Sequence, residues 1–307
     1  MRLIFFGTPE FAVATLDALI ADGQRVVAVV TAPDKPAGRG QTLVASPVKR
    51  AAEAYGLPVL QPTNLKAPEF QAELRGFAAD LQVVVAFRML PEAVWVMPSL
   101  GTLNVHASLL PQYRGAAPIN WALIHGETQT GVTTFRLQHA IDTGDVLLQE
   151  VVPIRPDDDF GTLYETLRQR GAALAVQTVR GLAAGTIQPL PQPSLPPDQL
   201  RPAPKLTKET GRLDFQRPAP ELLNWVRGLA PAPTAFTALP DGRLLKIFRA
   251  EAIAYDGPEA PGALLLDARA GTLAFRTPDG ALRVLDTQLE GKKRLPVAEL
   301  VRGLRFT

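Results

Sequence analysis

The sequence predicts an α/β fold, a Rossmann-like doubly wound and mainly parallel sheet, followed by a smaller all-β domain. Short apolar runs alternate with helical periodicity through the first half, and strand-like runs separated by glycine turns fill the end of the chain. A proline-rich stretch lies between these two parts. At 307 residues the chain exceeds the size at which one hydrophobic core usually keeps growing, so we expect two domains.

Four short apolar runs are the expected parallel strands of the first domain: Arg2–Phe6, Arg25–Thr31, Pro58–Leu60 and Leu81–Ala86. The first helix is predicted to begin with Thr8 as N-cap and Pro9 in its first turn. Ser46-Pro47 opens a second helix in the same way, and Gly56 suits the left-handed position after its end. A longer helix from Asp159 to Gly185 is predicted to close the domain.

Seven prolines between residues 188 and 204 exclude a regular helix or a central strand there. We therefore predict a domain over residues 1–188, a linker over 189–205 and a second domain over 206–307. The second domain should contain a helix near Pro220–Leu229. Its expected strands are Leu244–Phe248, Ala263–Leu266, Thr272–Arg276 and Leu282–Leu285, a pattern typical of a small β-barrel or a sandwich.

Composition excludes several classes of protein. The chain is 46% hydrophobic and 20% charged, which is typical of a folded rather than a disordered protein. No apolar run approaches the roughly 20 residues of a membrane span, and the opening run is too short for a secretory signal. We therefore expect a cytoplasmic protein with no membrane partner. The chain has no cysteine and three histidines, which excludes thiolate chemistry and argues against a metal site.

Basic residues concentrate in the second domain. Residues 1–200 contain 15 Lys and Arg against 18 Asp and Glu, whereas residues 201–307 contain 17 against 12. Such an excess favours a polyanionic partner whose phosphates the second domain holds. A solvated, Arg-rich surface without a partner would give the same count.

A candidate acyl-transfer site lies in the middle of the chain. In an extended strand Asn104 and His106 project from the same face, so their donors can converge on one oxygen. Asp142 follows on a loop and could return to meet the imidazole. The local alternatives are an Asn-His hydrogen-bonding pair at a strand edge and a turn-forming aspartate.

Two glycine-containing loops could contact a substrate. Gly7-Thr8 lies in a strand-to-helix turn that lacks the further glycines of a dinucleotide fingerprint, so a nicotinamide cofactor is not expected. Its amides either face a substrate group or only form the turn. Arg39 lies between two glycines in a long loop and could reach a phosphate, or the loop could have no role.

Eight strings, which span both halves of the chain in order, resemble the methionyl-tRNA formyltransferases. They are FFGTPEFA (5–12), PAGRG (36–40), SPVK (46–49), LNVHASLLPQYRGAAPI (103–119), TGVTTF (130–135), IDTGDVL (141–147), APKLTKETGRLDF (203–215) and EGKKR (290–294). The central string is shared with the wider superfamily that transfers formyl groups from 10-formyltetrahydrofolate. Amino-sugar nucleotide formyltransferases and formyltetrahydrofolate hydrolases of that superfamily are the alternatives. One departure lies at Phe87-Arg88-Met89, beside the expected folate pocket.

The resemblance implies a function and a set of site residues. The family transfers the formyl group of 10-formyltetrahydrofolate to the methionine amine of initiator methionyl-tRNA, with no metal, and its second domain is an OB-like barrel. We expect this chain to act as a monomer. The family's catalytic trio corresponds to Asn104, His106 and Asp142, and its folate-binding turn to Ser108, Leu109, Leu110 and Pro111. The expected contacts to the tRNA and its aminoacyl end are Gly7, Thr8, Arg39, Lys205, Lys208, Lys292, Lys293 and Arg294.

The chemistry of this reaction fits the trio. An α-amine with a pKa of roughly 7.7–8.0 or below is already partly neutral near pH 7, so strong base activation is unnecessary. The developing oxyanion needs donors, which Asn104 and a protonated His106 can supply. Asp142 would favour the imidazolium and orient it. The sequence leaves open whether Asp142, His106 or a water accepts the amine's proton.

Overall fold

The computed structural model describes residues 1–37 and 42–304. The chain forms two compact units, each of which is described by itself. The first contains residues 1–115, 129–153 and 164–202, and the second contains residues 116–128, 154–163 and 203–307. Two short segments that lie in the chain between parts of the first unit, residues 116–128 and 154–163, therefore belong to the second unit. Among the described residues, no helix is long and apolar enough to cross a membrane.

A seven-stranded sheet in the order β5-β2-β1-β6-β7-β8-β9 organises the first unit. The first five of these strands run parallel to one another. β8 runs antiparallel to β7, and β9 runs antiparallel to β8. The strands are β1 Arg2–Gly7, β2 Arg25–Val30, β5 Val59–Leu60, β6 Leu81–Val85, β7 Thr102–His106, β8 Gln129–Arg136 and β9 Val146–Pro153. The predicted doubly wound, mainly parallel sheet is confirmed.

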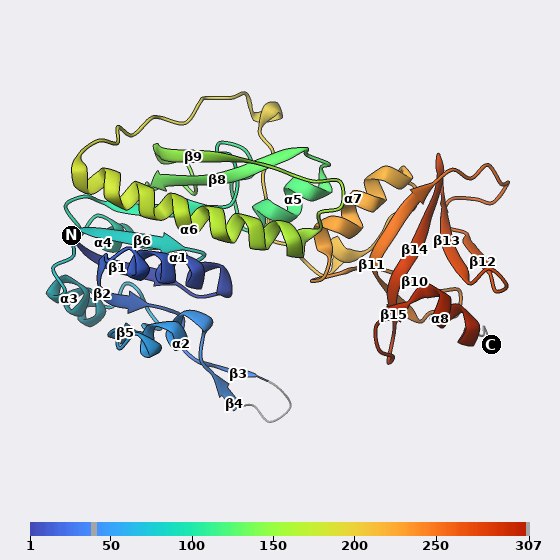
Figure 1. The fold of residues 1–307 in the computed structure, drawn as a ribbon, viewed down its shortest axis with the longest axis horizontal. Helices are drawn as coiled ribbons and strands as arrows, with labels where there is room; N and C mark the ends of the chain where they lie inside the picture. The colour runs from blue at the N-terminus through green and yellow to red at the C-terminus, as the bar shows by residue number, and fades with distance from the viewer. Residues whose placement is uncertain (38–41, 305–307) are drawn as a thin grey trace. The chain divides into compact units, whose positions relative to one another are not determined.

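Helices cover both faces of this sheet (Figure 1). On one face lie α1 (Glu10–Ala21) and α6 (Phe160–Ala184), and Phe11 of α1 makes an edge contact with Tyr164 of α6. Gly171 of α6 lets that helix approach Val105 and Val132 of the sheet. On the other face, α3 (Pro68–Gly76) and α4 (Glu92–Trp95) pack with Ile4, Phe6 and Val84 in one buried cluster.

The predicted helix ends agree with the structure at α2 (Pro47–Ala54) but not at α1. In α2, the Ser46 hydroxyl accepts a hydrogen bond from the Lys49 amide at 3.0 Å, which confirms the predicted N-cap. Gly56 adopts the expected left-handed conformation, with φ +66°. The prediction for the first helix was wrong by one residue. Pro9, not Thr8, occupies the N-cap of α1, and no side chain caps that end.

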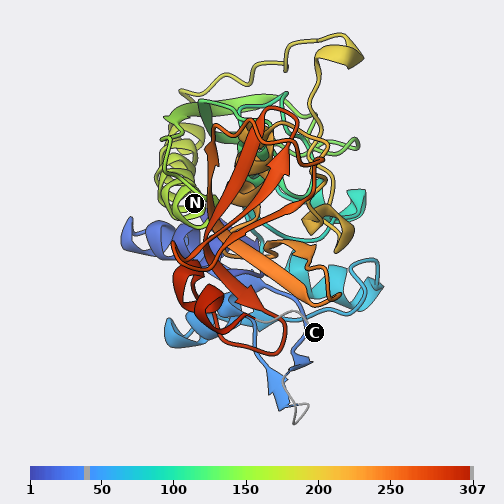
Figure 2. The ribbon, with the colours of Figure 1, turned by 90° about the vertical axis from the view of Figure 1, so that its right-hand side faces the viewer.

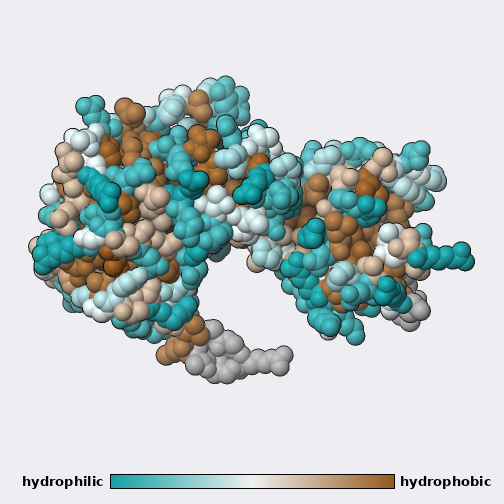
Figure 3. All heavy atoms as spheres, viewed as in Figure 1, coloured by the Kyte–Doolittle hydropathy of each residue, from teal (hydrophilic) through white to brown (hydrophobic). Residues whose placement is uncertain are grey.

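The long loop before α2 contains a short antiparallel pair of strands that was not predicted from the sequence. It consists of β3 (Lys35–Ala37) and β4 (Thr42–Val44). Leu43 and Val44 expose 66% and 47% of their surface, and apolar atoms border the grey segment in Figure 3. Arg39 lies outside the described residues, so its predicted contact stays a prediction.

The second unit is built around a twisted antiparallel sheet in the order β10-β11-β14-β13-β12, with β15 paired to β14 (Figure 2). Its strands are β10 Ala235–Ala238, β11 Leu244–Ile253, β12 Leu264–Asp267, β13 Thr272–Thr277, β14 Gly280–Leu289 and β15 Leu295–Pro296. In the described part of the chain β10 and β12 do not pair with each other, so this OB-like sheet is an open barrel.

Helices fill the core of the second unit. α7 (Ala219–Leu229) contributes Leu222, Val226 and Leu229 to a buried cluster with the sheet, and α8 (Val297–Gly303) contributes Leu300 and Val301. α5 (Pro118–Ile124) packs against α7, where the Asn120 amide donates to the carbonyl of Gly228 at 2.7 Å. A Cβ at Gly228 would lie 2.7 Å from Ile124, so the two helices approach closely because this residue is glycine.

The proline-rich segment is not a free spacer. Leu190 forms an isolated antiparallel bridge with Val146 at the start of β9. Further on, a short 3-10 helix, η1 (Pro197–Gln199), precedes hydrogen bonds between Arg201 and the segment at Gln112 and Tyr113. As predicted, no regular α-helix forms between residues 189 and 205. The predicted limits of the two domains and of the linker stay a prediction.

Candidate active site

The candidate site lies at the carboxyl edge of the parallel strands. β1 and β6 are neighbours in the sheet, and the chain winds outward from β1 to one edge and from β6 to the other. Ligands of open α/β sheets bind outside the carboxyl ends of the strands at such a reversal of strand order. His106 is the last residue of β7, which pairs with β6, so it lies beside this point.

Asn104 and His106 both belong to β7 and project from the same face, as the alternation predicts. Asn104 is half-buried, and its Oδ1 atom is buried without a hydrogen-bond partner among the described residues. A buried amide oxygen without a partner is costly in a folded protein. This atom therefore indicates a place where a ligand completes the hydrogen bonding.

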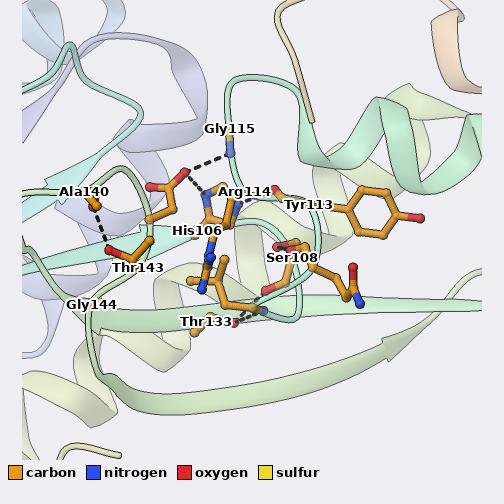
Figure 4. Close-up of polar contacts among 12 residues, drawn as sticks. His106, Ser108, Tyr113, Arg114, Gly115, Thr133, Ala140, Thr143 and Gly144 are labelled. Atoms are coloured by element: carbon orange, nitrogen blue, oxygen red, sulfur yellow. Dashed lines mark hydrogen bonds and ion pairs between the residues drawn. The ribbon is translucent and has the colours of Figure 1, made fainter. Parts of the chain in front are cut away.

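The His106 ring, which is 7% exposed, lies between two oxygens (Figure 4). Its Nε2 lies 2.8 Å from the carbonyl oxygen of Tyr113, and its Nδ1 lies 3.9 Å from Oδ2 of Asp142. A carbonyl only accepts, so Nε2 carries a proton and donates it to Tyr113. Nδ1 is therefore the ring nitrogen that can take up a proton beside the Asp142 carboxylate.

Asp142 is held in place from several sides. Its Oδ2 accepts a hydrogen bond from the Gly115 amide at 2.9 Å, and its backbone adopts a left-handed conformation with φ +54°. Gly144, two residues further on, lies so close to β8 that a Cβ there would be 1.7 Å from the Arg136 carbonyl oxygen. The structure therefore brings together all three residues of the predicted trio at one edge of the sheet.

The predicted folate-binding turn follows His106 directly and packs onto β8. Ser108, fully buried, donates to the Gln112 carbonyl at 2.7 Å. Thr133 of β8 donates to the Ser108 carbonyl at 2.6 Å and accepts from the Leu110 amide at 3.3 Å. The Leu109 side chain packs on Gly131, and Pro111 follows a cis peptide bond. The turn is thus rigidly attached to the sheet, while its role in folate binding stays a prediction.

Packing within the unit accounts for Gly7. A Cβ on this residue would lie 2.6 Å from that of Ala12 and 2.8 Å from the Phe5 ring. This close packing favours the interpretation of the Gly7-Thr8 segment as a strand-to-helix turn. The departure at Arg88 has a structural explanation as well, because its guanidinium donates to the carbonyls of Pro62 and Thr63. Arg88 therefore braces the loop after β5.

The predicted phosphate contacts in the second unit differ in their surroundings. The side chains of Lys205, Lys208, Lys292 and Lys293 are exposed and make no hydrogen bond or ion pair within residues 1–37 and 42–304. Arg294 instead donates through Nε and Nη2 to Asp286, and its guanidinium stacks 4.2 Å above the Phe248 ring. Its Nη1 is the nitrogen left out of this ion pair.

One residue of the site was not predicted from the sequence. Gln192, in the proline-rich segment, accepts hydrogen bonds from Arg114 and donates to the backbone of the Asp142 loop. The bonds from Arg114 to Gln192 favour a bracing role for this arginine over a substrate contact. Of the remaining histidines, the ring of His125 makes a tilted contact with that of Trp121, and His139 is exposed. In the part of the chain that the structure describes, no cluster of three potential metal ligands occurs.

Comparison with known proteins identifies the family. Residues 1–179 match the family described as formyl transferase, and residues 205–305 match its C-terminal domain. The methionyl-tRNA formyltransferase of Bacteroides fragilis is 48% identical over 312 residues, which cover 100% of this chain and 96% of that protein. The chain belongs to the methionyl-tRNA formyltransferase family. The enzyme of the same name from Porphyromonas gingivalis is also 48% identical, and it too is matched over 100% of this chain.

Solved structures more distant than these methionyl-tRNA formyltransferases share the fold. An N-formyltransferase from Helicobacter canadensis, in complex with folinic acid and dTDP-3-aminofucose, superposes with a TM-score of 0.67 at 15% identity, over 94% of this chain and 100% of that one. HypX from Aquifex aeolicus, in complex with tetrahydrofolic acid, gives a TM-score of 0.65 at 20% identity over 98% of this chain. The chain spans only 47% of the length of HypX. At these identities the comparison shows the fold alone.

Proposed function

We propose that this chain transfers the formyl group of 10-formyltetrahydrofolate to the α-amine of methionine on initiator methionyl-tRNA, giving formylmethionyl-tRNA and tetrahydrofolate. One observation carries the proposal. Asn104, His106 and Asp142 meet at the carboxyl edge of the sheet in a chain that is 48% identical over its full length to named methionyl-tRNA formyltransferases. The substrate would place the activity in the cytoplasm, and we propose that the enzyme acts there as a monomer.

The Asn104 side chain can form hydrogen bonds both to a formyl group and to an attacking amine. A carboxamide offers donors and an acceptor at one point. In the proposed site the Asn104 amide donates to the formyl oxygen, and its buried Oδ1 can accept from the attacking amine. The folate supplies an activated formyl group, and the residues of this chain orient it and stabilise the charge that develops.

His106 would stabilise the developing negative charge, and Asp142 would stabilise the imidazolium and accept a proton. Because Nε2 of His106 already donates to Tyr113, the imidazolium would present Nδ1–H to the oxygen on which negative charge develops. The Asp142 carboxylate, 3.9 Å from Nδ1, stabilises that positive charge. Its Oδ2 is engaged by Gly115, so Oδ1 is the oxygen available to receive the proton that the amine loses, directly or through a water.

The other predicted contacts complete the proposal. The turn of Ser108, Leu109, Leu110 and Pro111 would border the folate, and the Gly7-Thr8 turn and Arg39 would lie near the aminoacyl end. Residues 1–188 would form the catalytic domain, residues 189–205 the linker and residues 206–307 the tRNA-binding domain. The exposed lysines, and Arg294 through its Nη1, would meet phosphates of the RNA.

The test is transfer of a labelled formyl group from 10-formyltetrahydrofolate with four acceptors in parallel. These are charged initiator tRNA, elongator methionyl-tRNA, an amino-sugar nucleotide and water. Selective labelling of the initiator is expected. Transfer to the sugar nucleotide would instead assign the chain to the amino-sugar branch, and release of formate without labelled RNA would assign it to the hydrolases. Either of these results would contradict the proposal.

A further inference from the structure

The side chain of Gln192 joins two segments that form the catalytic site. Its Oε1 accepts hydrogen bonds from Nε and Nη2 of Arg114, at 3.2 and 2.6 Å. Its Nε2 donates to the carbonyl oxygens of Asp142 and Gly144, both at 2.8 Å. A guanidinium only donates and a carbonyl only accepts, so these partners fix the orientation of the carboxamide. The glutamine carboxamide therefore serves as acceptor for Arg114 and as donor to the loop carbonyls at the same time.

The backbone holds Gln192 at this place. Two residues earlier, Leu190 exchanges two hydrogen bonds with Val146, each 2.8 Å long. Val146 begins β9 and follows the Asp142 loop almost directly. The proline-rich segment is thus attached to the sheet beside the loop that Gln192 contacts, and the position of the side chain follows from this bridge.

The contacts form a closed ring around the catalytic carboxylate. Asp142 is joined through its side chain to the Gly115 amide, and through its backbone to Gln192. Gln192 in turn accepts a hydrogen bond from Arg114, the neighbour of Gly115 in the chain. The residue before Arg114 is Tyr113, whose carbonyl oxygen accepts a hydrogen bond from Nε2 of His106. One tripeptide, 113–115, therefore fixes both the imidazole and the carboxylate, and Gln192 ties it to the Asp142 loop.

Asp142 needs this support because of its backbone conformation. A φ of +54° is uncommon for a residue with a side chain. The bonds from Gln192 to the carbonyls of residues 142 and 144 bracket the turn and oppose its relaxation. We propose that Gln192 is a positioning residue that holds the Asp142 carboxylate against Gly115 and beside Nδ1 of His106. The kinetic part of this inference rests on the proposed function.

The test compares Gln192→Ala and Gln192→Glu with Gln199→Ala in the full-length protein. Gln192→Glu keeps an acceptor for Arg114 but loses both donors to the loop, so it should behave like Gln192→Ala. Gln199 lies in the same segment, and its exposed side chain makes no hydrogen bond among the described residues. Two quantities are measured, kcat with both substrates saturating and hydrogen exchange of the Gly115 amide, which reports its bond to Asp142 without any substrate.

Both Gln192 variants should exchange the Gly115 amide roughly tenfold faster, because the loop opens locally. They should also lower kcat by roughly 10- to 100-fold, since small misplacements of reacting groups carry losses of this size. Gln199→Ala should match wild type in both measurements. Gln192 variants that match this control in either quantity would overturn the inference. If wild type transfers no formyl group, the proposed function fails, and the exchange measurement alone decides whether Gln192 holds the loop.

Discussion

His106 donates its Nε2 proton to the carbonyl oxygen of Tyr113, 2.8 Å away. This hydrogen bond sets the tautomer of the ring, because it leaves Nδ1 as the nitrogen that can gain or lose a proton. From the sequence we expected Asp142 to orient the imidazole. In the structure a backbone carbonyl does so from the opposite side of the ring, and the carboxylate is left to act on the charge of Nδ1.

Replacing Asp142 by asparagine should separate the charge of this side chain from its position. The Asp142→Asn variant keeps an oxygen that can accept from the Gly115 amide but loses the negative charge beside Nδ1 of His106. We expect kcat for formyl transfer to fall by on the order of 10²-fold or more, because acid-base groups contribute effects of this size. Exchange of the Gly115 amide should stay slow. A variant with unchanged kcat would show that the charge is dispensable.

Replacing Gly144 by alanine should disturb the same loop through packing. A Cβ there would lie 1.7 Å from the Arg136 carbonyl oxygen, so the backbone must move. We expect a loss of about 1–3 kcal/mol in the free energy of unfolding, as is typical of overpacked sites, together with lower kcat. Gly76→Ala is the matched control, since a Cβ at that residue meets nothing within 4 Å. Equal stability of the two variants in denaturant unfolding would refute the packing argument.

The second unit should bind RNA in a manner that depends on salt. The double variant Lys292→Ala and Lys293→Ala removes two exposed positive charges, so the slope of log K against log salt should fall by roughly two units. Arg294→Ala should change the slope less than either single lysine variant, because Asp286 and Phe248 already engage its guanidinium. Filter-binding titrations with initiator tRNA at several salt concentrations measure these slopes. An unchanged slope in the double variant would exclude these lysines from the interface.

The stability of the second unit should depend on pH through Asp279. Its carboxylate accepts hydrogen bonds from the Ala219 amide, at the start of α7, and from the Thr277 hydroxyl. The amide of Ala219 above all lowers the pKa of Asp279 below its ordinary value of 3.8. A carboxyl group whose pKa is lowered by folding stabilises the protein above its unfolded pKa, and this contribution is lost as the pH falls through the folded pKa.

Asp279→Asn should therefore melt at a lower temperature than wild type near pH 7. The difference between the two melting temperatures should shrink as the pH falls below about 4. Thermal unfolding followed by circular dichroism over this range measures the difference. A gap that stays constant with pH would mean that the carboxylate charge does not stabilise the start of α7.

Local signals in the sequence predicted the parts of this structure that depend on neighbouring residues. The Ser46 N-cap, the left-handed Gly56 and the shared face of Asn104 and His106 all follow from local patterns. The β3–β4 pair was missed because each strand has only three residues, and the stretch from residue 33 to 44 contains two prolines and two glycines. Gln192 was missed for another reason. Its partners lie 50 and 78 residues away in the chain, and only the folded sheet brings them together.

The most direct test of the proposed mechanism is single-turnover transfer of a labelled formyl group to initiator methionyl-tRNA by wild type and by Asn104→Ala. The buried Oδ1 of Asn104 has no partner among the described residues, so the substitution removes little from the fold itself. The rate should fall by on the order of 10²–10³-fold, the loss typical of an oxyanion donor, while melting temperature is retained. A fully active Asn104→Ala enzyme would contradict the assignment of the oxyanion site.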